Sequence, residues 1–245
     1  MESVKTRALI IRTTDYGEAN RSIKIFTPDL GIVRATVYGA RSRKKSLGGE
    51  SRVFSLCSLV LTRGRGGIMR AEQISIEEGF YPLSEDIVKL SAAVYFADLA
   101  EACIGFGNSD EGVLRLLLNT LWAMCYAGVP AEKARAVYQL RLAAAGGWEP
   151  ALGACISCGA ADGAMYFDSE RGGLLCKSCR RPSSAPLPPA VLAAMRGILA
   201  AEDKKIFAFR AEDAVTDAVA ELSEEYLLGR IERTPASLAY YKNIR

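Results

Sequence analysis

Four of the seven cysteines stand in two C-x₂-C pairs, Cys155 with Cys158 and Cys176 with Cys179, and seventeen residues separate the two pairs. This spacing allows two reverse turns to present four thiolates at the corners of a tetrahedron, the arrangement in which proteins bind structural zinc. Gly159, directly after the second cysteine, supplies the positive φ that such a turn needs. We therefore predict one structural Zn²⁺ with these four cysteines as its ligands.

The same sequence argues against an enzyme. The chain contains no histidine, which removes His-based catalytic triads and the most frequent general base. Four thiolates leave a zinc ion no open position for water, and no GxxxxGK[ST] phosphate-binding loop is present. We expect the neighbours Glu224 and Glu225 to lie on a solvated helix face, and we predict no catalytic residue. An enzyme that uses the zinc lobe only as a support is a minor alternative.

The composition is that of a globular chain in a reducing compartment. Hydrophobic residues make up 50% and charged residues 24% of the 245 residues. The longest apolar stretch, Val113 to Val129, is interrupted by Arg115 and Asn119, so no membrane span is expected. The first residues lack the apolar segment of a signal peptide, and an odd number of cysteines with metal spacing does not suit a disulfide framework. We expect a cytoplasmic protein.

Charge is distributed unevenly along the chain. Residues 1–80 contain 14 Lys and Arg against 8 Asp and Glu, and residues 81–245 contain 17 against 20. The excess is strongest in residues 21–70, with 11 basic residues against Asp29 and Glu50. A basic region joined to a mildly acidic one is typical of proteins that bind polyanions.

The first eighty residues have the pattern of five β-strands. The β-branched runs ALIIRTT, SIKIFT, IVRATVYGA, VFSLCSLVLT and IMRAEQISI alternate with turn sequences such as PDLG. In the third run the odd-numbered residues 33–37 form an apolar face, and Arg34, Thr36 and Tyr38 form the other face. Five strands in about eighty residues match the size of an OB-type barrel, whose sheet face and loops commonly bind oligonucleotides. An SH3-like or other small barrel without a ligand has the same strand count.

Two glycine-flanked loops, GARSRKKSLGG and TRGRGG, carry much of the positive charge. Mobile cations beyond a barrel wall are suited to phosphate contacts. The aromatic residues Tyr16, Phe26 and Tyr38 near this surface are candidates for stacking on unpaired bases, although each such residue is more often ordinary core or surface. The predicted DNA-binding residues are Arg34, Tyr38, Arg41, Arg43, Lys44, Lys45, Arg63 and Arg65.

From residue 81 onward the pattern is helical. One helix begins near Ser84 and Asp86 and ends at Gly105, and another begins after Pro130. Two more helices are expected near 188–202 and 211–232, after the Pro/Ser-rich linker RPSSAPLPP. The helix between 105 and 130 has one apolar stripe at helical spacing, which we expect to be buried. Its members are Leu114, Leu117, Leu118, Leu121, Trp122 and Cys125, and Cys103 is expected to be a second buried thiol.

These observations predict an α+β multidomain fold, in which an N-terminal OB-like β-barrel precedes an all-α domain with an inserted Cys₄ zinc module. The expected boundaries are 1–80 for the nucleic-acid-binding barrel, 81–150 for the first helical part, 151–181 for the zinc module and 182–245 for the second helical part.

The order of these parts resembles the RecO family of bacterial recombination mediators, over essentially the whole chain. The resemblance is carried by ALIIRTTDYGEANRSIKIFTPDLGIVRATVYGARSRKKS, by FSLCSLVLTRGRGG and by YQLRLAAAGGWEPALGACISCG. Two departures stand out. The Cys₄ module occurs in only part of the family, and the segment GGESRVF is a looser match, so the resemblance implies no role for Arg52.

The resemblance implies a protein without enzymatic activity that binds single- and double-stranded DNA and anneals complementary strands in DNA repair and recombination. With RecR, it would help RecA replace the single-strand-binding protein SSB on gapped DNA. The helical domain would dock the acidic C-terminal tail of SSB, and by position Arg135 and Arg141 could supply cations for it, unless both are solvated helix residues. The expected location is the cytoplasm, in association with the nucleoid, and no membrane or small-molecule partner is expected. An OB-type RNA-binding factor of translation or ribosome assembly remains the alternative.

Overall fold

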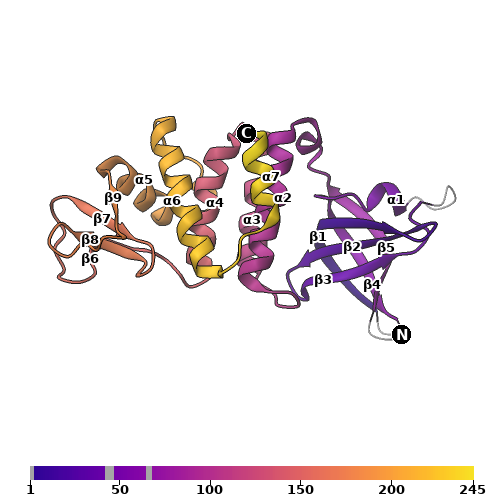
Figure 1. The fold of residues 1–245 in the computed structure, drawn as a ribbon. Coiled ribbons are helices and arrows are strands. Elements are labelled where there is room, and N and C mark those ends of the chain that lie inside the picture. The colour runs from indigo at the N-terminus through magenta and orange to yellow at the C-terminus, as the bar shows by residue number, and fades with distance from the viewer. Residues whose placement is uncertain (1–2, 42–46, 65–67) are drawn as a thin grey trace.

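The computed structural model describes residues 3–41, 47–64 and 68–245. Three parts follow one another along an elongated molecule: a β-barrel, a group of helices, and a small sheet that carries the four paired cysteines (Figure 1). The expected α+β class, with an N-terminal sheet and a helical C-terminal part, is confirmed.

Five strands form a closed barrel in the order β1-β2-β3-β5-β4. Their bounds are β1 (Ser3–Tyr16), β2 (Asn20–Thr27), β3 (Gly31–Val37), β4 (Leu56–Arg63) and β5 (Met69–Glu78), and a short helix, α1 (Leu47–Glu50), precedes β4. β4 closes the barrel by pairing with β1, and β3 and β5 are parallel neighbours. The interior is apolar, and Ala35 and Val37 point into it as the alternation predicts.

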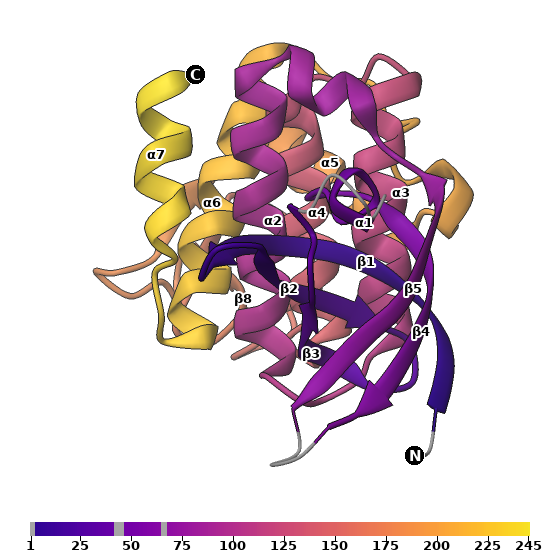
Figure 2. The same ribbon diagram turned by 90° about the vertical axis from the view of Figure 1, so that its right-hand side faces the viewer.

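The barrel, which lies in front of the helices in Figure 2, is fixed to them through its outer surface. Leu9, Phe26 and Ile32 belong to the hydrophobic core of the helices, while their strand neighbours fill the barrel. Gly31 has φ +69°, and a Cβ atom on it would lie 1.9 Å from the carbonyl oxygen of Asn108. The peptide N–H of Gly107 donates to the Ile32 oxygen at 2.9 Å. Backbone therefore meets backbone at this junction, and only glycine fits position 31.

The helices are α2 (Ile87–Ile104), α3 (Glu111–Tyr126), α4 (Ala131–Ala145), α5 (Pro189–Ala200), α6 (Asp213–Ile231) and α7 (Ala236–Ile244), with 3₁₀ turns η2 (Tyr81–Glu85) and η3 (Asp203–Lys205). Asp86 begins α2 by accepting hydrogen bonds from the peptide N–H groups of Val88 and Lys89. Helix α7, which the sequence analysis does not predict, packs against α2. It returns the C-terminus to the barrel side of the helices (Figure 1).

The buried face of α3 differs from the predicted apolar stripe. Leu114, Leu117 and Leu121 are buried, but Trp122 is 54% exposed. The buried face of α3 includes Ala123 and Met124 instead, because α3 packs against α4, α2 and the η2 segment. Trp122 instead contacts Tyr126, with 6.0 Å between ring centroids. The prediction for Trp122 is therefore wrong.

The two expected buried thiols are only half-buried. Burial nevertheless raises the pKa of Cys103 to about 12 and the pKa of Cys125 to about 11. Both thiols therefore stay protonated near neutral pH, and all seven cysteines are free of disulfides.

The cysteine-bearing sheet has the order β6-β8-β7-β9, with β6 (Ala151–Cys155), β7 (Met165–Asp168), β8 (Gly173–Cys176) and β9 (Ala185–Leu187). Strand β9 lies inside the predicted Pro/Ser linker, so the sheet continues beyond residue 181. The module rests on α6 through Phe167 and Tyr226, whose ring centroids are 5.4 Å apart. The Tyr226 hydroxyl also donates to the Trp148 carbonyl oxygen at 3.0 Å.

Candidate metal centre and nucleic-acid interface

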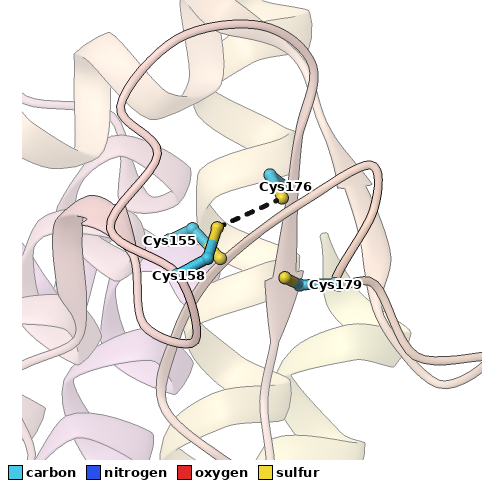
Figure 3. A group of neighbouring side chains, drawn as sticks. All are labelled: Cys155, Cys158, Cys176 and Cys179. Carbon is cyan, nitrogen blue, oxygen red and sulfur yellow. Dashed lines mark hydrogen bonds between the residues drawn. The ribbon is translucent and has the colours of Figure 1, made fainter.

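The four paired cysteines converge on one point. Their Sγ atoms all lie within 4.8 Å of one another (Figure 3), and the Sγ atoms of Cys158 and Cys176 are 3.7 Å apart. Four sulfur atoms placed tetrahedrally around zinc at its usual bond length are separated by about 3.8 Å. The cluster could therefore hold a metal ion, and an all-sulfur set of four ligands suits zinc and leaves no open coordination position.

Each C-x₂-C pair lies on a tight turn that begins at the end of a strand, β6 for Cys155 and β8 for Cys176. The peptide N–H of Gly159 donates to the Cys155 oxygen at 2.8 Å, and that of Cys179 donates to the Cys176 oxygen at 3.0 Å. Gly159 has φ +77°, as predicted from its place after the second cysteine. Backbone hydrogen bonds lower the pKa of the Cys155 and Cys176 thiols, whereas hydrogen bonds among the thiols raise the pKa of Cys179 and, against a backbone hydrogen bond at Ala160, that of Cys158.

The outer face of the barrel changes character along β1, β2 and β3. Directly opposed residues form three cross-strand rows, and residues of one row share a face of the sheet. The rows are Leu9–Phe26–Ile32, Arg12–Lys24–Arg34 and Thr14–Ser22–Thr36. The first row is buried under the helices, and the third lies farther from them and continues to Arg70 of β5. With increasing distance from the helices, the outer face is therefore first apolar, then cationic and finally rich in hydroxyl groups.

The middle row is used for two purposes. Arg12 pairs with Asp98 at 2.8 Å and Lys24 pairs with Glu101 at 2.6 Å, and both acids belong to α2. Arg34 is exposed, and its guanidinium carbon lies 5.7 Å from the centroid of the Phe106 ring. Two cations of this row therefore attach the barrel to α2, and the third is presented to solvent beside an aromatic ring.

A second arginine–aromatic pair lies at the far end of β3. The guanidinium carbon of Arg70 is 4.6 Å from the centroid of the exposed Tyr38 ring. Between the two pairs, the Tyr16 hydroxyl donates to Thr36 Oγ1 at 3.2 Å. Arg34 and Tyr38 are both exposed on the outer face, as the alternation predicts, whereas Thr36 between them is buried, only 7% exposed. Phe26, in contrast, is fully buried in the helical core and cannot stack on a base.

The remaining predicted DNA contacts fall into two groups. Arg41 is exposed and donates to the Glu18 carbonyl oxygen at 2.6 Å, so it lies against the β1–β2 turn. Arg63 is exposed at the end of β4. Arg43, Lys44, Lys45 and Arg65 lie outside the described residues.

Arg70 and Phe106 are not among the residues predicted from the sequence. Arg70 reaches Tyr38 only because β3 and β5 are parallel neighbours, which a single sequence does not reveal. Its Nε lies 3.5 Å from a Glu72 carboxylate oxygen and makes no hydrogen bond within the described residues. Phe106 stands between Gly105 and Gly107, and in sequence this Gly-Phe-Gly segment indicates only the end of a helix.

The structure corrects the expectation for Arg135. Its side chain is fully buried and bonds to three carboxylates, Glu132 at 2.8 Å, Glu221 at 2.8 Å and Glu224 at 2.7 Å. A side chain with no exposed surface cannot contact a partner, and it is not a solvated residue either. Glu224, expected to be solvated, is buried in the same network and also contacts Lys242.

Arg141 remains accessible at the edge of a cavity of about 300 Å³. Its guanidinium donates to the Leu199 carbonyl oxygen at 2.9 Å and to Asp203 at 2.7 Å. Arg115 lines the same cavity and lies 3.2 Å from Asp203. Two guanidinium groups therefore share one carboxylate here.

Within the part of the chain that the structure describes, no helix combines the length and the apolar character needed to cross a membrane.

Comparison with known proteins matches both halves of the chain to one family. Residues 1–80 match the model described as "Recombination protein O N terminal", and residues 84–239 match "Recombination protein O C terminal". A "DNA repair protein RecO" from Anaeromyxobacter dehalogenans (strain 2CP-C) is 31% identical over 240 residues, 94% of each chain. The protein of the same name from Roseiflexus sp. (strain RS-1) is 31% identical over 98% of this chain and 86% of its own, and that from Alkaliphilus metalliredigens (strain QYMF) is 28% identical over 94% of each chain.

Proposed function

The chain belongs to the RecO family, and from this premise we propose that it is a DNA-binding protein of recombinational repair whose barrel holds the DNA strand. One observation carries the proposal. The outer face of the barrel combines a row of hydroxyl groups with two exposed arginine–aromatic pairs, Arg34 with Phe106 and Arg70 with Tyr38. Cations for phosphates together with rings for bases are what a single-strand binding surface requires.

The barrel topology supports an OB-type assignment. Five strands close with β1 against β4, and β3 runs parallel to β5. In OB-type domains the face of the second and third strands and the adjacent loops bind oligonucleotides, and here that face carries Ser22, Arg34 and Thr36. The family membership favours DNA over the RNA-binding alternative.

We propose that binding is mainly electrostatic and has little sequence preference, because phosphate contacts position a strand without reading its bases. Arg41 and Arg63 border the surface. Arg43, Lys44, Lys45 and Arg65 add charge from the two glycine-flanked loops.

The activity that fits these features is that of a mediator without a catalytic residue. In this proposal the protein anneals complementary strands and, together with RecR, helps RecA replace SSB on single-stranded DNA. The Cys₄ cluster binds one Zn²⁺ that stabilises the terminal sheet and takes no part in chemistry, because all four positions are filled by protein sulfur.

For the acidic tail of SSB, we propose the cavity beside Arg115 and Arg141. A carboxylate of the tail would compete with Asp203 for the two guanidinium groups. The Arg115 side chain is 59% exposed and its ion pair is with Asp203, so Arg115→Gln should weaken binding of a tail peptide without altering the fold. Arg233→Gln, at an exposed arginine elsewhere, is the matched control, and equal tail affinity in both variants would refute this location.

The DNA-binding proposal is tested by the salt dependence of single-strand affinity. Replacing Arg43, Lys44 and Lys45 with Glu should weaken binding of an oligo(dT). It should also reduce the slope of log K against log[salt] by about 0.7 for each phosphate that the variant no longer neutralises. The control variant replaces Lys204, Lys205 and Arg233 of the helical part with Glu, so that its net charge changes by the same amount. An equal effect of both triple variants would mean that net charge, and not the loop, determines binding.

A further inference from the structure

We propose that Phe106, in the loop between α2 and α3, is a base-stacking platform that extends the single-strand binding surface from the barrel onto the helical part of the molecule. This inference rests on the proposed DNA binding and adds a contact that lies outside the barrel sequence. The ligand proposed for the Phe106 ring is an unpaired base of single-stranded DNA.

Phe106 is presented to solvent by its backbone. The side chain is 56% exposed, although burying an aromatic ring is favourable. Gly105 at φ +78° and Gly107 at φ +84° flank it. The loop is then fixed to the start of β3, because Ile32 donates to the Asn108 oxygen at 3.3 Å and accepts from Gly107 at 2.9 Å. The ring is therefore held at a defined place beside the barrel without being packed into a core.

The charge around the ring favours a polyanion. Arg34 lies 5.7 Å from the ring centroid and has no acidic partner within the described ranges. The two acids of α2 that face this row, Asp98 and Glu101, are both neutralised by Arg12 and Lys24. Asp110, the next acid along the loop, accepts a hydrogen bond from the peptide N–H of Val113 as the cap of α3. Arg34 is therefore free to contact a phosphate while Phe106 offers a face to the adjoining base.

The pair formed by Arg34 and Phe106 is followed along β3 by a second arginine–aromatic pair. Arg34 lies on β3 and Tyr38 directly follows the end of this strand, four residues further on, a distance of about 13 Å for an extended chain. At the Tyr38 end the cation is Arg70, 4.6 Å from the ring centroid, and unlike Arg34 it also lies 3.5 Å from a carboxylate oxygen of Glu72. The hydroxyls of Tyr16 and Thr36 occupy the space between the two pairs. An aromatic ring and an arginine at each end of a polar strip would let one strand stack at two points while its backbone follows β3.

The test separates stacking on bases from contact with the backbone. The affinities of wild type, Phe106→Ala and Phe106→Leu are measured for oligo(dT) and for an abasic deoxyribose-phosphate oligomer of the same length. Stacking on one base corresponds to a loss of roughly 5- to 150-fold for oligo(dT). We expect that loss in both variants, unchanged affinity for the abasic oligomer, and retention of oligo(dT) affinity in Phe106→Trp. Tyr240→Ala, which removes another 56% exposed ring from α7, should change neither affinity.

The possible outcomes are distinct. Equal oligo(dT) affinity of wild type and Phe106→Leu would overturn the inference while leaving the proposed function in place. Equal losses for oligo(dT) and the abasic oligomer would also overturn it, because the ring would then act on the fold or on the phosphate contacts. If wild type itself failed to bind oligo(dT), the proposed function would fail first. Phe106→Leu keeps most of the apolar volume, so it preserves the test if Phe106→Ala unfolds.

Discussion

Replacing Arg135 with methionine should destabilise the helical part of the protein strongly. The Arg135 guanidinium is fully buried and forms ion pairs with Glu132 of its own helix and with Glu221 and Glu224, which connect α4 to α6. Methionine has a similar apolar stem and lacks the charge. The substitution therefore leaves the three carboxylates with fewer cations and little loss of packing volume.

The magnitude follows from what remains in the network. Removing one partner of a buried ion pair typically costs about 3–5 kcal/mol. Here Lys242 still contacts Glu224, and Arg245 still pairs with Glu132 at 2.9 Å and Glu221 at 3.0 Å. We therefore expect a loss at the lower end of this range, about 3 kcal/mol of unfolding free energy. This loss corresponds to a fall in Tm of about 6–12 °C for a chain of this size.

Urea unfolding followed by circular dichroism measures this loss. Arg233→Met, at an exposed arginine, is the control and should change stability by less than about 0.5 kcal/mol. Adding Glu224→Gln to Arg135→Met should recover part of the loss, because it removes one of the uncompensated charges. A loss below about 1 kcal/mol would refute the reasoning. If Arg135→Met kept full stability and abolished SSB-tail binding, the partner role predicted from sequence would be restored.

The same network predicts a pH dependence. Burial raises the pKa of the Glu221 carboxyl, but the hydrogen bond and charge of Arg135 outweigh it and lower that pKa to about 2, from an ordinary value of 4.5. A carboxyl whose pKa is lowered by folding stabilises the protein above its unfolded pKa, and this contribution is lost as the pH falls toward the folded pKa. The stability difference between wild type and Arg135→Met should therefore narrow as the pH falls from about 5 to about 2. A difference that stays constant over this range would contradict the assignment.

Two further predictions concern the metal centre and the junction. Elemental analysis should find one zinc per chain. Cys176→Ser or strong chelation should remove the zinc and lower Tm, because four-cysteine zinc sites contribute directly to folding. A zinc-free protein whose Tm is unaffected by chelation would contradict this prediction. Gly31→Ala should lower the unfolding free energy by about 2 kcal/mol or more, since position 31 combines a positive φ with a Cβ position 1.9 Å from the Asn108 carbonyl oxygen. Thermal unfolding measures it, and Gly153→Ala, where a Cβ has open space, is the control.

Local sequence patterns are sufficient for the parts of the fold that depend on local chemistry. The C-x₂-C spacing and Gly159 predict the turns of the cysteine cluster, and Asp86 and Gly105 mark the ends of α2. The alternation in β3 predicts both the buried face and the exposed positions of Arg34 and Tyr38. In each case the signal lies within a few residues of the feature that it determines.

The errors concern features that depend on contacts between distant segments. An apolar stripe does not determine which other elements a helix packs against. The predicted burial of Trp122 is wrong for that reason. Arg135 and Glu224 resemble solvated residues in sequence because these two ion-pair partners are 89 positions apart in the chain. Arg70 and Phe106 join the candidate interface only through the parallel pairing of β3 with β5 and the contact of the α2–α3 loop with β3.

The most direct test of the proposed function is annealing of complementary oligonucleotides that are coated beforehand with the cognate SSB. Wild type is compared with the variant in which Arg43, Lys44 and Lys45 are replaced by Glu. The proposal predicts rapid annealing by wild type and its loss in the variant, with both proteins equally folded. Tight, salt-dependent binding of naked DNA without any annealing of SSB-coated strands would contradict it and would leave a general polyanion-binding protein.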